Sequence, residues 1–242
     1  MLLKTRGIIF RTVKYSETSI IADIFTEEKG LQSFIISGVR NPKSKVGSGV
    51  FQVMSLVELV AYYRDNGKLN RIKEVRPWEV FQSIPFQIEK MAVGMFMAEI
   101  CQKSIKTAEK NQELFDFLCD SFLLLDRTEK SIANFHLAFM LRLTQYLGFL
   151  PGGEFSEETP YFDLKEGVFE EVVPLHPNFL NKEESEDFGD LSEMNMLRAH
   201  ELKFTRDRRR TLLKNLINFF KYHIDDFGEV QTHKVFETVL SG

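Results

Sequence analysis

The sequence predicts an α+β protein with a small closed β-barrel over residues 1–80 and an α-helical domain over residues 81–242. Three observations lead to this prediction. Five short runs of β-branched and apolar residues fill the first part, apolar residues recur at helical spacing after Pro85, and residues 151–200 form an acidic interval with neither rhythm. Strands followed by helices are typical of the α+β class, here with an irregular acidic insertion.

The five predicted strands are separated by polar or glycine-containing turns. They are Leu3–Val13, Ser19–Thr26, Leu31–Ser37, Val53–Tyr63 and Leu69–Val75. Asp65-Asn66-Gly67 is a strong turn signal between the last two strands. A sheet of five short strands protects its edges best by closing on itself, so a barrel with one long connection is expected.

After Pro85 the spacing of apolar residues changes to three and four, which is typical of amphipathic helices. The predicted apolar stripes are Ile88, Met91, Ala92 and Met95; Phe115, Leu118, Cys119, Phe122 and Leu125; Phe135, Phe139, Leu143 and Leu147; and Leu212, Leu213, Leu216, Ile217 and Phe220. Gly148 is a suitable C-terminal cap for the third helix, with Pro151 beyond it. Short connections indicate a packed bundle, and most of the 23 Phe residues are expected in cores.

Residues 151–200 lose the helical rhythm. A small hairpin is expected over Tyr161–Phe169, around the turn Glu166-Gly167. We interpret the acidic stretch Lys182–Asp190 as a solvated loop, because neither its spacing nor a glycine turn matches a calcium-binding loop. The whole interval is therefore predicted to be an irregular excursion.

The net charge of −4 conceals a strong asymmetry along the chain. Residues 1–80 carry 13 Lys and Arg against 8 Asp and Glu, whereas residues 151–200 carry 3 against 13. Association depends on the local field of a patch rather than on the net charge. An anionic partner is therefore expected at the N-terminal third of the chain.

Common catalytic and metal-binding patterns are missing from the sequence. It has no GxxxxGK[ST] phosphate loop and no CxxC pair, and its five histidines are scattered. His136 is expected to be packed in a helix. Cys101 and Cys119, the two cysteines, also lie in predicted helices, so no disulfide is expected. Structural zinc is not expected either. We predict a non-enzymatic protein without cofactor or metal. With neither a signal peptide nor a membrane-spanning apolar run, a cytoplasmic location is expected.

Two basic groups indicate nucleic-acid binding by the predicted barrel. The first is the loop Gly38–Gly49, which has three cations and no anion. Its glycines and serines leave backbone N–H groups accessible, so the loop can follow a phosphate backbone without recognising sequence. The second group surrounds the turn before the fifth strand. The candidate DNA-binding residues are Arg40, Lys43 and Lys45 in the loop and Arg64, Lys68, Arg71, Lys73 and Arg76 around the turn.

Several motifs follow one another in the order and spacing of a known signature. In the N-terminal part they are Tyr15–Ser19, Phe25–Leu31 and Ser37–Lys45. Further along, Leu147–Pro151 has the sequence Leu-Gly-Phe-Leu-Pro, and Tyr161–Asp163 (Tyr-Phe-Asp) precedes a glycine. In these motifs, and over nearly its whole length, the sequence resembles the RecO family.

The resemblance implies a barrel of the oligonucleotide-binding (OB) type and a role in DNA repair and homologous recombination. RecO proteins bind single- and double-stranded DNA, anneal complementary strands and, with RecR, help load RecA onto strands coated with single-stranded-DNA-binding protein. A bacterial, nucleoid-associated location would follow. Many RecO proteins carry a four-cysteine zinc module after the Leu-Gly-Phe-Leu-Pro motif, but residues 151–200 contain no cysteine. We therefore expect a degenerate, metal-free form of that module.

The resemblance also implies a site for the acidic, apolar C-terminal tail of single-stranded-DNA-binding protein. The candidate residues are Arg206, Arg208, Arg209, Arg210, Leu213 and Ile217, where cations precede an apolar helical stripe. Arginine can pair a carboxylate through two hydrogen bonds while apolar neighbours hold a Phe or Leu side chain. Two alternatives stay open. The stripe could be buried in the bundle, and the whole chain could be a helical protein–protein adaptor without direct DNA binding, which the acidic interval favours.

Overall fold

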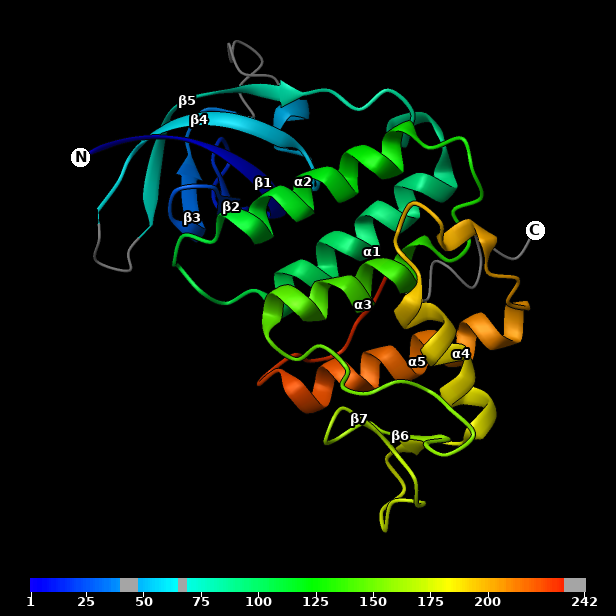
Figure 1. Cartoon of the computed structure of the whole chain (residues 1–242). Coiled ribbons are helices and arrows are strands. Elements are labelled where there is room, and N and C mark those ends of the chain that lie inside the picture. The colour runs from blue at the N-terminus through cyan, green and yellow to red at the C-terminus, as the bar shows by residue number, and fades with distance from the viewer. Residues whose placement is uncertain (40–47, 65–68, 233–242) are drawn as a thin grey trace. The chain divides into compact units, whose positions relative to one another are not determined.

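The computed structural model describes residues 1–39, 48–64 and 69–232. The chain divides into two compact units, Met1–Arg127 and Thr128–Gly242, and each is described by itself (Figure 1). Four of the candidate DNA-binding residues lie outside the described residues, namely Arg40, Lys43, Lys45 and Lys68.

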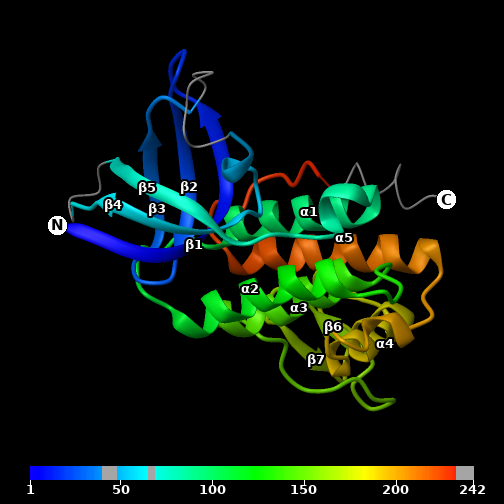
Figure 2. The same ribbon diagram turned by 90° about the horizontal axis from the view of Figure 1, so that it is seen from above.

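The first unit begins with a five-stranded closed barrel, as predicted. Its strands are β1 (Leu2–Lys14), β2 (Ile20–Thr26), β3 (Gly30–Ile36), β4 (Leu56–Tyr62) and β5 (Asn70–Glu79). They pair in the order β1-β2-β3-β5-β4, and β4 pairs back onto β1, as the view from above in Figure 2 helps to follow. All pairs are antiparallel except β3 with β5. This small five-stranded barrel is of the OB type.

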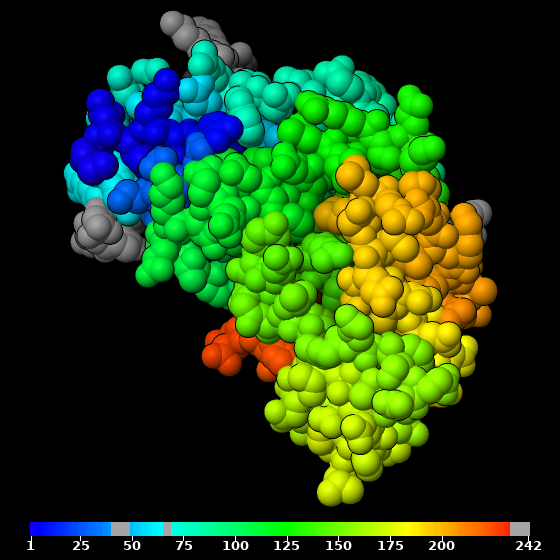
Figure 3. Space-filling view, in the orientation of Figure 1, coloured from blue at the N-terminus to red at the C-terminus, as the bar shows by residue number. Residues whose placement is uncertain are grey.

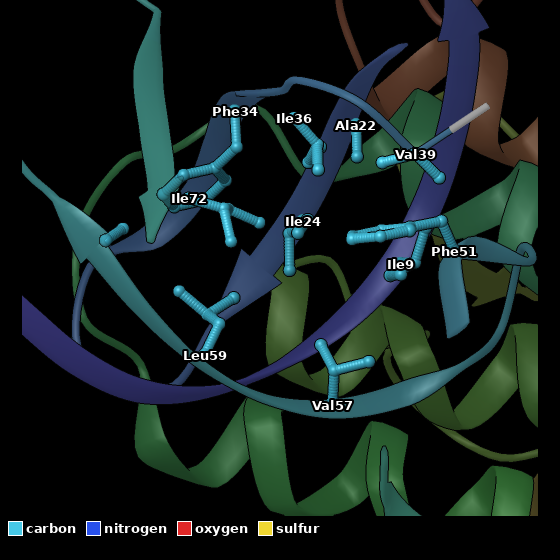
Figure 4. Close-up of a cluster of buried hydrophobic side chains, with 11 residues drawn as sticks. Ile9, Ala22, Ile24, Phe34, Ile36, Val39, Phe51, Val57, Leu59 and Ile72 are labelled. Atoms are coloured by element: carbon cyan, nitrogen blue, oxygen red, sulfur yellow. The ribbon is translucent and has the colours of Figure 1, made fainter. Parts of the chain in front are cut away.

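Inward-facing residues of the strands fill the barrel interior. Ile24 and Phe34 are fully buried there among other aliphatic side chains (Figure 4). The connection between β3 and β4 adds Val39 and, from the short 3-10 helix η1 (Ser48–Phe51), Phe51. Burying a large apolar side chain stabilises the fold by about 1.5–3 kcal/mol. The barrel therefore has a hydrophobic core of its own.

Two strand boundaries differ from the prediction by more than one residue. β4 begins at Leu56 rather than at Val53, because Met54 has a positive φ of 76° and interrupts the extended chain. β5 continues past Pro77, which pairs with β4 beside a shift in register. Proline has no N–H to donate, and such an irregularity is one of the places where a strand tolerates it.

Two helices complete the first unit: α1 (Ile88–Ser104), which follows the short helix η2 (Ile84–Phe86), and α2 (Gln112–Arg127). The stripe predicted on α2 is confirmed, since all five of its residues are buried: Phe115, Leu118, Cys119, Phe122 and Leu125. Polar residues occupy much of the opposite side of α2, so the spacing of its apolar residues predicts the buried face correctly.

The stripe predicted on α1 is wrong. Ile88, Met91 and Met95 are 63%, 40% and 37% exposed, and only Ala92 of the predicted set is buried. The buried face instead includes Val93 and its neighbours along the helix. α1 is apolar on nearly all sides, so several spacings of three and four fit its sequence equally well. Periodicity alone therefore could not select the buried face.

Aromatic and charged side chains join the barrel to α2 within the first unit. The rings of Phe25 in β2 and Phe115 in α2 lie 6.2 Å apart. Arg6 pairs with Glu27 and lies 4.4 Å from the ring centre of Trp78. The hydrogen bond from Arg6 lowers the pKa of Glu27, against the opposing effect of burial. Arg6 thus has a structural role although it belongs to the basic N-terminal third.

The second unit combines helices with a small sheet. Its elements are α3 (Phe135–Leu147), β6 (Tyr161–Asp163), β7 (Val168–Glu170), β8 (Phe179–Leu180), α4 (Lys182–Glu193), η3 (Ala199–Glu201) and α5 (Arg206–His223). The sheet order is β7-β6-β8. Gly148 ends α3 with a φ of 86°, as predicted for a C-terminal cap. The predicted hairpin is confirmed, because β6 pairs antiparallel with β7.

The acidic stretch Lys182–Asp190 is a helix, α4, and its prediction as a solvated loop is wrong. Asn181 caps this helix: its side chain accepts a hydrogen bond from the Glu184 N–H at 3.1 Å, and the Glu184 carboxylate accepts one from the Asn181 N–H at 3.2 Å. This reciprocal capping box satisfies two backbone donors. Acidic residues in the first turn also suit the positive end of the helix dipole, so the charge that suggested a loop favours the helix.

Phenylalanine side chains form much of the core of the second unit, as expected. The ring of Phe162 lies 4.4 Å from that of Phe188, 4.9 Å from that of Phe169 and 5.6 Å from that of Phe219. These centroid distances are typical of packed aromatic pairs. The residues come from β6, β7, α4 and α5, so the cluster ties the small sheet to two helices.

Candidate nucleic-acid interface

The described part of the second basic group lies on the outer surface of the barrel. Arg71, Lys73 and Arg76 are exposed on β5, and Arg64 is exposed just after β4. Ile72, between two of these cations, is 9% exposed and points into the barrel. Because side chains of a strand alternate between its faces, the barrel core fixes the outward direction of the cations beside Ile72.

Two of these four cations have acidic partners. Arg76 donates a hydrogen bond from Nε to Glu58 at 2.7 Å, and the Lys4 ammonium lies 3.1 Å from the same carboxylate. The hydrogen bond from Arg76 lowers the pKa of Glu58. The Lys73 ammonium lies 3.2 Å from Glu74. Exposed ion pairs contribute only about 0–1 kcal/mol, so a phosphate group can replace the carboxylate at either cation.

Arg64 and Arg71 differ from the other two. Within the described ranges, neither guanidinium forms an ion pair with an acidic side chain. The buried Asn70 lies between them in sequence and accepts a hydrogen bond from the Arg64 N–H at 2.9 Å, which fixes the base of the β4–β5 turn. Among the described residues, Arg64 and Arg71 therefore stand without an acidic partner on either side of residues 65–68.

The strand register places Arg71 in a row of outward side chains that crosses the barrel. The successive Cα partners, taken from β1 through β2, β3 and β5 to β4, are Val13, Ile21, Ile35, Arg71 and Tyr62. Directly paired residues of neighbouring strands project from the same face of a sheet. These five side chains therefore form one continuous row, which we call the Arg71 row.

Aromatic and basic residues lie at both ends of the Arg71 row. Tyr62, at one end, is 51% exposed, and Tyr15, in the turn beyond the other end, is 59% exposed. Lys14 is exposed beside Val13 and forms no ion pair with the described acidic residues. Lys14, Tyr15 and Tyr62 were not among the predicted site residues. The register of paired strands brings Tyr62 beside Arg71, while Lys14 and Tyr15 follow Val13 in the chain, and Tyr15 also stands in the N-terminal signature.

This arrangement has the chemistry of a surface for single-stranded nucleic acid. Exposed aromatic rings and flat aliphatic side chains can stack on bases, and unpaired cations can contact phosphates without regard to sequence. The bases of a single strand are accessible for such stacking, whereas those of a duplex are already stacked on one another.

The predicted partner-binding residues at the start of α5 make contacts within the second unit. Arg208 forms a two-pronged ion pair with the buried Asp187 of α4, with 2.7 Å between Nε and Oδ2. Arg209 donates to a backbone carbonyl oxygen of the preceding loop at 2.6 Å. Leu213 is 9% exposed, and Ile217 is half-buried. Asp187 offsets the cation at the helix N-terminus, where the dipole alone would disfavour it.

The buried titratable groups indicate packing rather than chemistry. Burial raises the pKa of Cys101 and raises that of Cys119 to about 12, so both thiols stay protonated at neutral pH. Among the residues that the structure describes, no three His, Cys, Asp or Glu side chains gather as a metal site. In the same part of the chain, no helix has both the length and the apolar character needed to cross a membrane.

The fold and the Arg71 row define a class of protein: an OB-type barrel followed by a helical, Phe-packed unit. Comparisons with known proteins identify the family within this class. The family model "Recombination protein O N terminal" matches residues 1–81, and "Recombination protein O C terminal" matches residues 85–229. The chain belongs to the RecO family, which confirms the resemblance seen in the sequence.

Proteins of known name support this assignment over the full chain. The DNA repair protein RecO of Phocaeicola vulgatus is 35% identical over 100% of both chains. That of Bacteroides fragilis is 36% identical over 94% of both, and that of Flavobacterium psychrophilum is 34% identical over 100% of both. All three are named for DNA repair, so the general role of this family is repair.

Proposed function

We propose that this protein is a recombination mediator in DNA repair. It binds single- and double-stranded DNA, anneals complementary strands and, with RecR, helps load RecA onto strands coated with single-stranded-DNA-binding protein. The observation that supports this proposal most directly is the Arg71 row, in which a cation without an acidic partner among the described residues stands between aliphatic side chains and an exposed tyrosine. Family membership supports the general role in repair.

The dimensions of the row suit a short single strand. Neighbouring strands of a sheet lie about 4.8 Å apart, so the row follows a path of about 20 Å round the curved surface of the closed barrel. OB folds bind about 4–16 nucleotides, and a row of this length fits the lower end of that range. We propose that bases stack on Tyr15 and Tyr62 while Lys14 and Arg71 contact phosphates between them.

The loop cations Arg40, Lys43 and Lys45, with Lys68, are proposed to extend the same surface. They lie outside the described residues. In the sequence, the first three follow β3, which contains Ile35, and Lys68 precedes β5, which contains Arg71. Phosphate contacts from basic side chains do not depend on base identity. The loop would therefore add affinity for single and double strands alike. Stacking of bases on the row alone would not account for binding to double strands.

Protein partners are proposed for the second unit. The acidic tail of single-stranded-DNA-binding protein requires a cation and an apolar pocket. Asp187 and a backbone carbonyl already hold Arg208 and Arg209. Of the predicted set, Arg206 and Arg210 are exposed, whereas Arg208 and Arg209 are half-buried, so Arg206 and Arg210 are the residues to substitute when tail binding is measured.

The DNA-binding proposal is tested by fluorescence anisotropy with a labelled oligothymidine. We expect the double variant Lys14→Gln, Arg71→Gln to lose about tenfold in affinity and to reduce the salt dependence by about 0.7 for each lost phosphate contact. The matched control is Arg198→Gln, Lys221→Gln, which removes the same charge from exposed residues of the second unit. The control should bind like the wild type.

Equal affinities for the double variant and the control would contradict binding at the Arg71 row. If the wild type itself showed no salt-dependent retention on single strands, the alternative of a helical protein–protein adaptor would be favoured, since a phosphate interface always has a steep salt dependence.

A further inference from the structure

The loop Glu171–Pro177, which connects β7 to β8, presents aliphatic side chains to solvent. Leu175 is fully exposed at 107%, Val172 is 75% exposed and Val173 is 44% exposed. Figure 3 shows the surrounding part of the chain, in yellow-green, at the lower end of the view. Single exposed aliphatic residues are common, but several so close together are typical of a surface that binds another protein.

The base of this loop is held in shape by polar contacts. His176 Nε2 lies 3.0 Å from Asp163 Oδ2, and His176 Nδ1 accepts a hydrogen bond from the Asn178 N–H at 3.2 Å. Pro174 and Pro177 restrict the backbone on both sides of Leu175 and His176. The loop is thus ordered by its base and by its prolines, while Leu175 takes no part in the packing that orders it.

The surroundings of the loop are strongly acidic. Glu166 and Glu171 are exposed, Glu170 is half-buried, and none of them forms an ion pair with the described cations. Residues 151–200 as a whole carry 3 Lys and Arg against 13 Asp and Glu. Nucleic acid would be repelled here. A partner must combine an apolar surface with unpaired cations, because only that combination matches both the aliphatic and the acidic side chains.

The Arg71 row has this combination of properties. Val13, Ile21 and Ile35 lie side by side on the outer face of the barrel, and Lys14 and Arg71 have no acidic partners among the described residues. We propose that the loop Glu171–Pro177 of one copy of this protein docks on the Arg71 row of a second copy. Leu175 and Val172 cover the aliphatic part of the row, and Glu170 and Glu171 pair with Arg71.

Such self-association would regulate DNA binding, a consequence that rests on the function proposed above. The acidic loop and a DNA strand carry the same sign of charge and occupy the same row, so they exclude each other. A free chain would therefore be partly self-associated, and a single strand would disperse it. The self-association itself requires no DNA and can be measured without it.

The first test is sedimentation velocity of the full chain without DNA, at low and high salt. We expect a concentration-dependent association that weakens with salt, since the contact pairs opposite charges. Leu175→Ser should raise the dissociation constant about tenfold, or about 1.4 kcal/mol. Leu197→Ser is the matched control, because Leu197 is a 66% exposed leucine of the same unit outside the loop, and it should leave the association unchanged.

The second test is charge complementation between two variants. Arg71→Glu and Glu171→Arg should each abolish self-association, because each brings like charges together. A mixture of the two should associate again, since the acidic loop of the first variant meets the intact row of the second. Circular dichroism of both variants checks that they are folded.

Two results would overturn the proposal: a wild type that is monomeric at every attainable concentration, or a mixture that stays monomeric. A monomeric wild type that still binds oligothymidine through the Arg71 row would overturn self-association and leave the proposed function intact. Self-association that oligothymidine does not disperse, in a chain without DNA affinity at the row, would instead support the docking contact and contradict the proposed function.

Discussion

Arg71 and Arg208 show two different roles of an arginine on this fold. Arg208 donates two hydrogen bonds to the buried carboxylate of Asp187, which fixes the start of α5 against α4. Arg71 stands between Ile35 and Tyr62 with no acidic partner in the described part of the chain. The partner of Arg208 is distant in sequence, so a run of arginines alone does not distinguish a structural residue from one that binds a ligand.

Asp187→Ala should destabilise the second unit by about 2 kcal/mol, because it leaves a guanidinium beside the core without its partner. The loss is smaller than for a wholly buried pair, since the Arg208 side chain is 38% exposed. Urea unfolding followed by circular dichroism measures this change. Glu157→Ala, which removes the surface partner of Lys182, is the control and should unfold like the wild type. Equal destabilisation by both variants would contradict a structural role for Arg208.

His136 should make the free energy of unfolding depend on pH between about 3 and 6.5. Burial, with the nearby Arg209 charge, lowers the pKa of His136 to about 3, whereas an unfolded histidine titrates near pH 6.5. Between these values the unfolded chain binds a proton that the folded protein does not. The free energy of unfolding therefore falls as the pH decreases from about 6.5 towards 3, by up to about 1.4 kcal/mol per pH unit.

His136→Leu should remove this dependence, so the wild type and the variant should differ in slope between pH 7 and pH 5. Urea midpoints at the two pH values provide the measurement. His200→Gln, at the surface, should keep the wild-type slope. If the slope survives in His136→Leu, another group controls the pH dependence.

At the scale of the elements, the strands and most helices follow from local patterns, but their faces and partners do not. The five strands were predicted within a few residues because barrel strands alternate and turns carry glycine or asparagine. The buried face of α1 does not follow from its sequence because the helix is apolar on nearly all sides. α4 does not follow because a run of acidic residues is typical of a solvated loop as well as of the first turn of a capped helix. The Arg71 row depends on the pairing of four strand neighbours, which no local pattern encodes.

Asn181→Ala should cost about 1 kcal/mol of stability, since it removes the side chain that caps α4. Thermal unfolding followed by circular dichroism would show a lower midpoint for this variant. Glu186→Ala, an exposed change within the same helix, should have little effect because alanine is a good helix former. A capping variant as stable as the control would show that α4 is held by its packing alone.

At the scale of the whole molecule, charge is divided between two kinds of surface. The basic third of the chain forms a barrel with an aliphatic, aromatic and cationic row, and the acidic interval forms a small sheet and a capped helix. The basic loop 40–47 lies outside the described residues, and its contribution stays a prediction. The barrel alone provides the surface on which the proposed DNA binding depends.

Photo-crosslinking tests this central claim most directly. An oligonucleotide in which 5-iodouracil replaces thymine is irradiated with the full chain, and the crosslinked peptides are identified by mass spectrometry. We predict crosslinks at Tyr15 and Tyr62, the exposed aromatic residues at the two ends of the Arg71 row. Crosslinks confined to residues 128–232, with none on the barrel, would contradict the assignment of DNA binding to the Arg71 row.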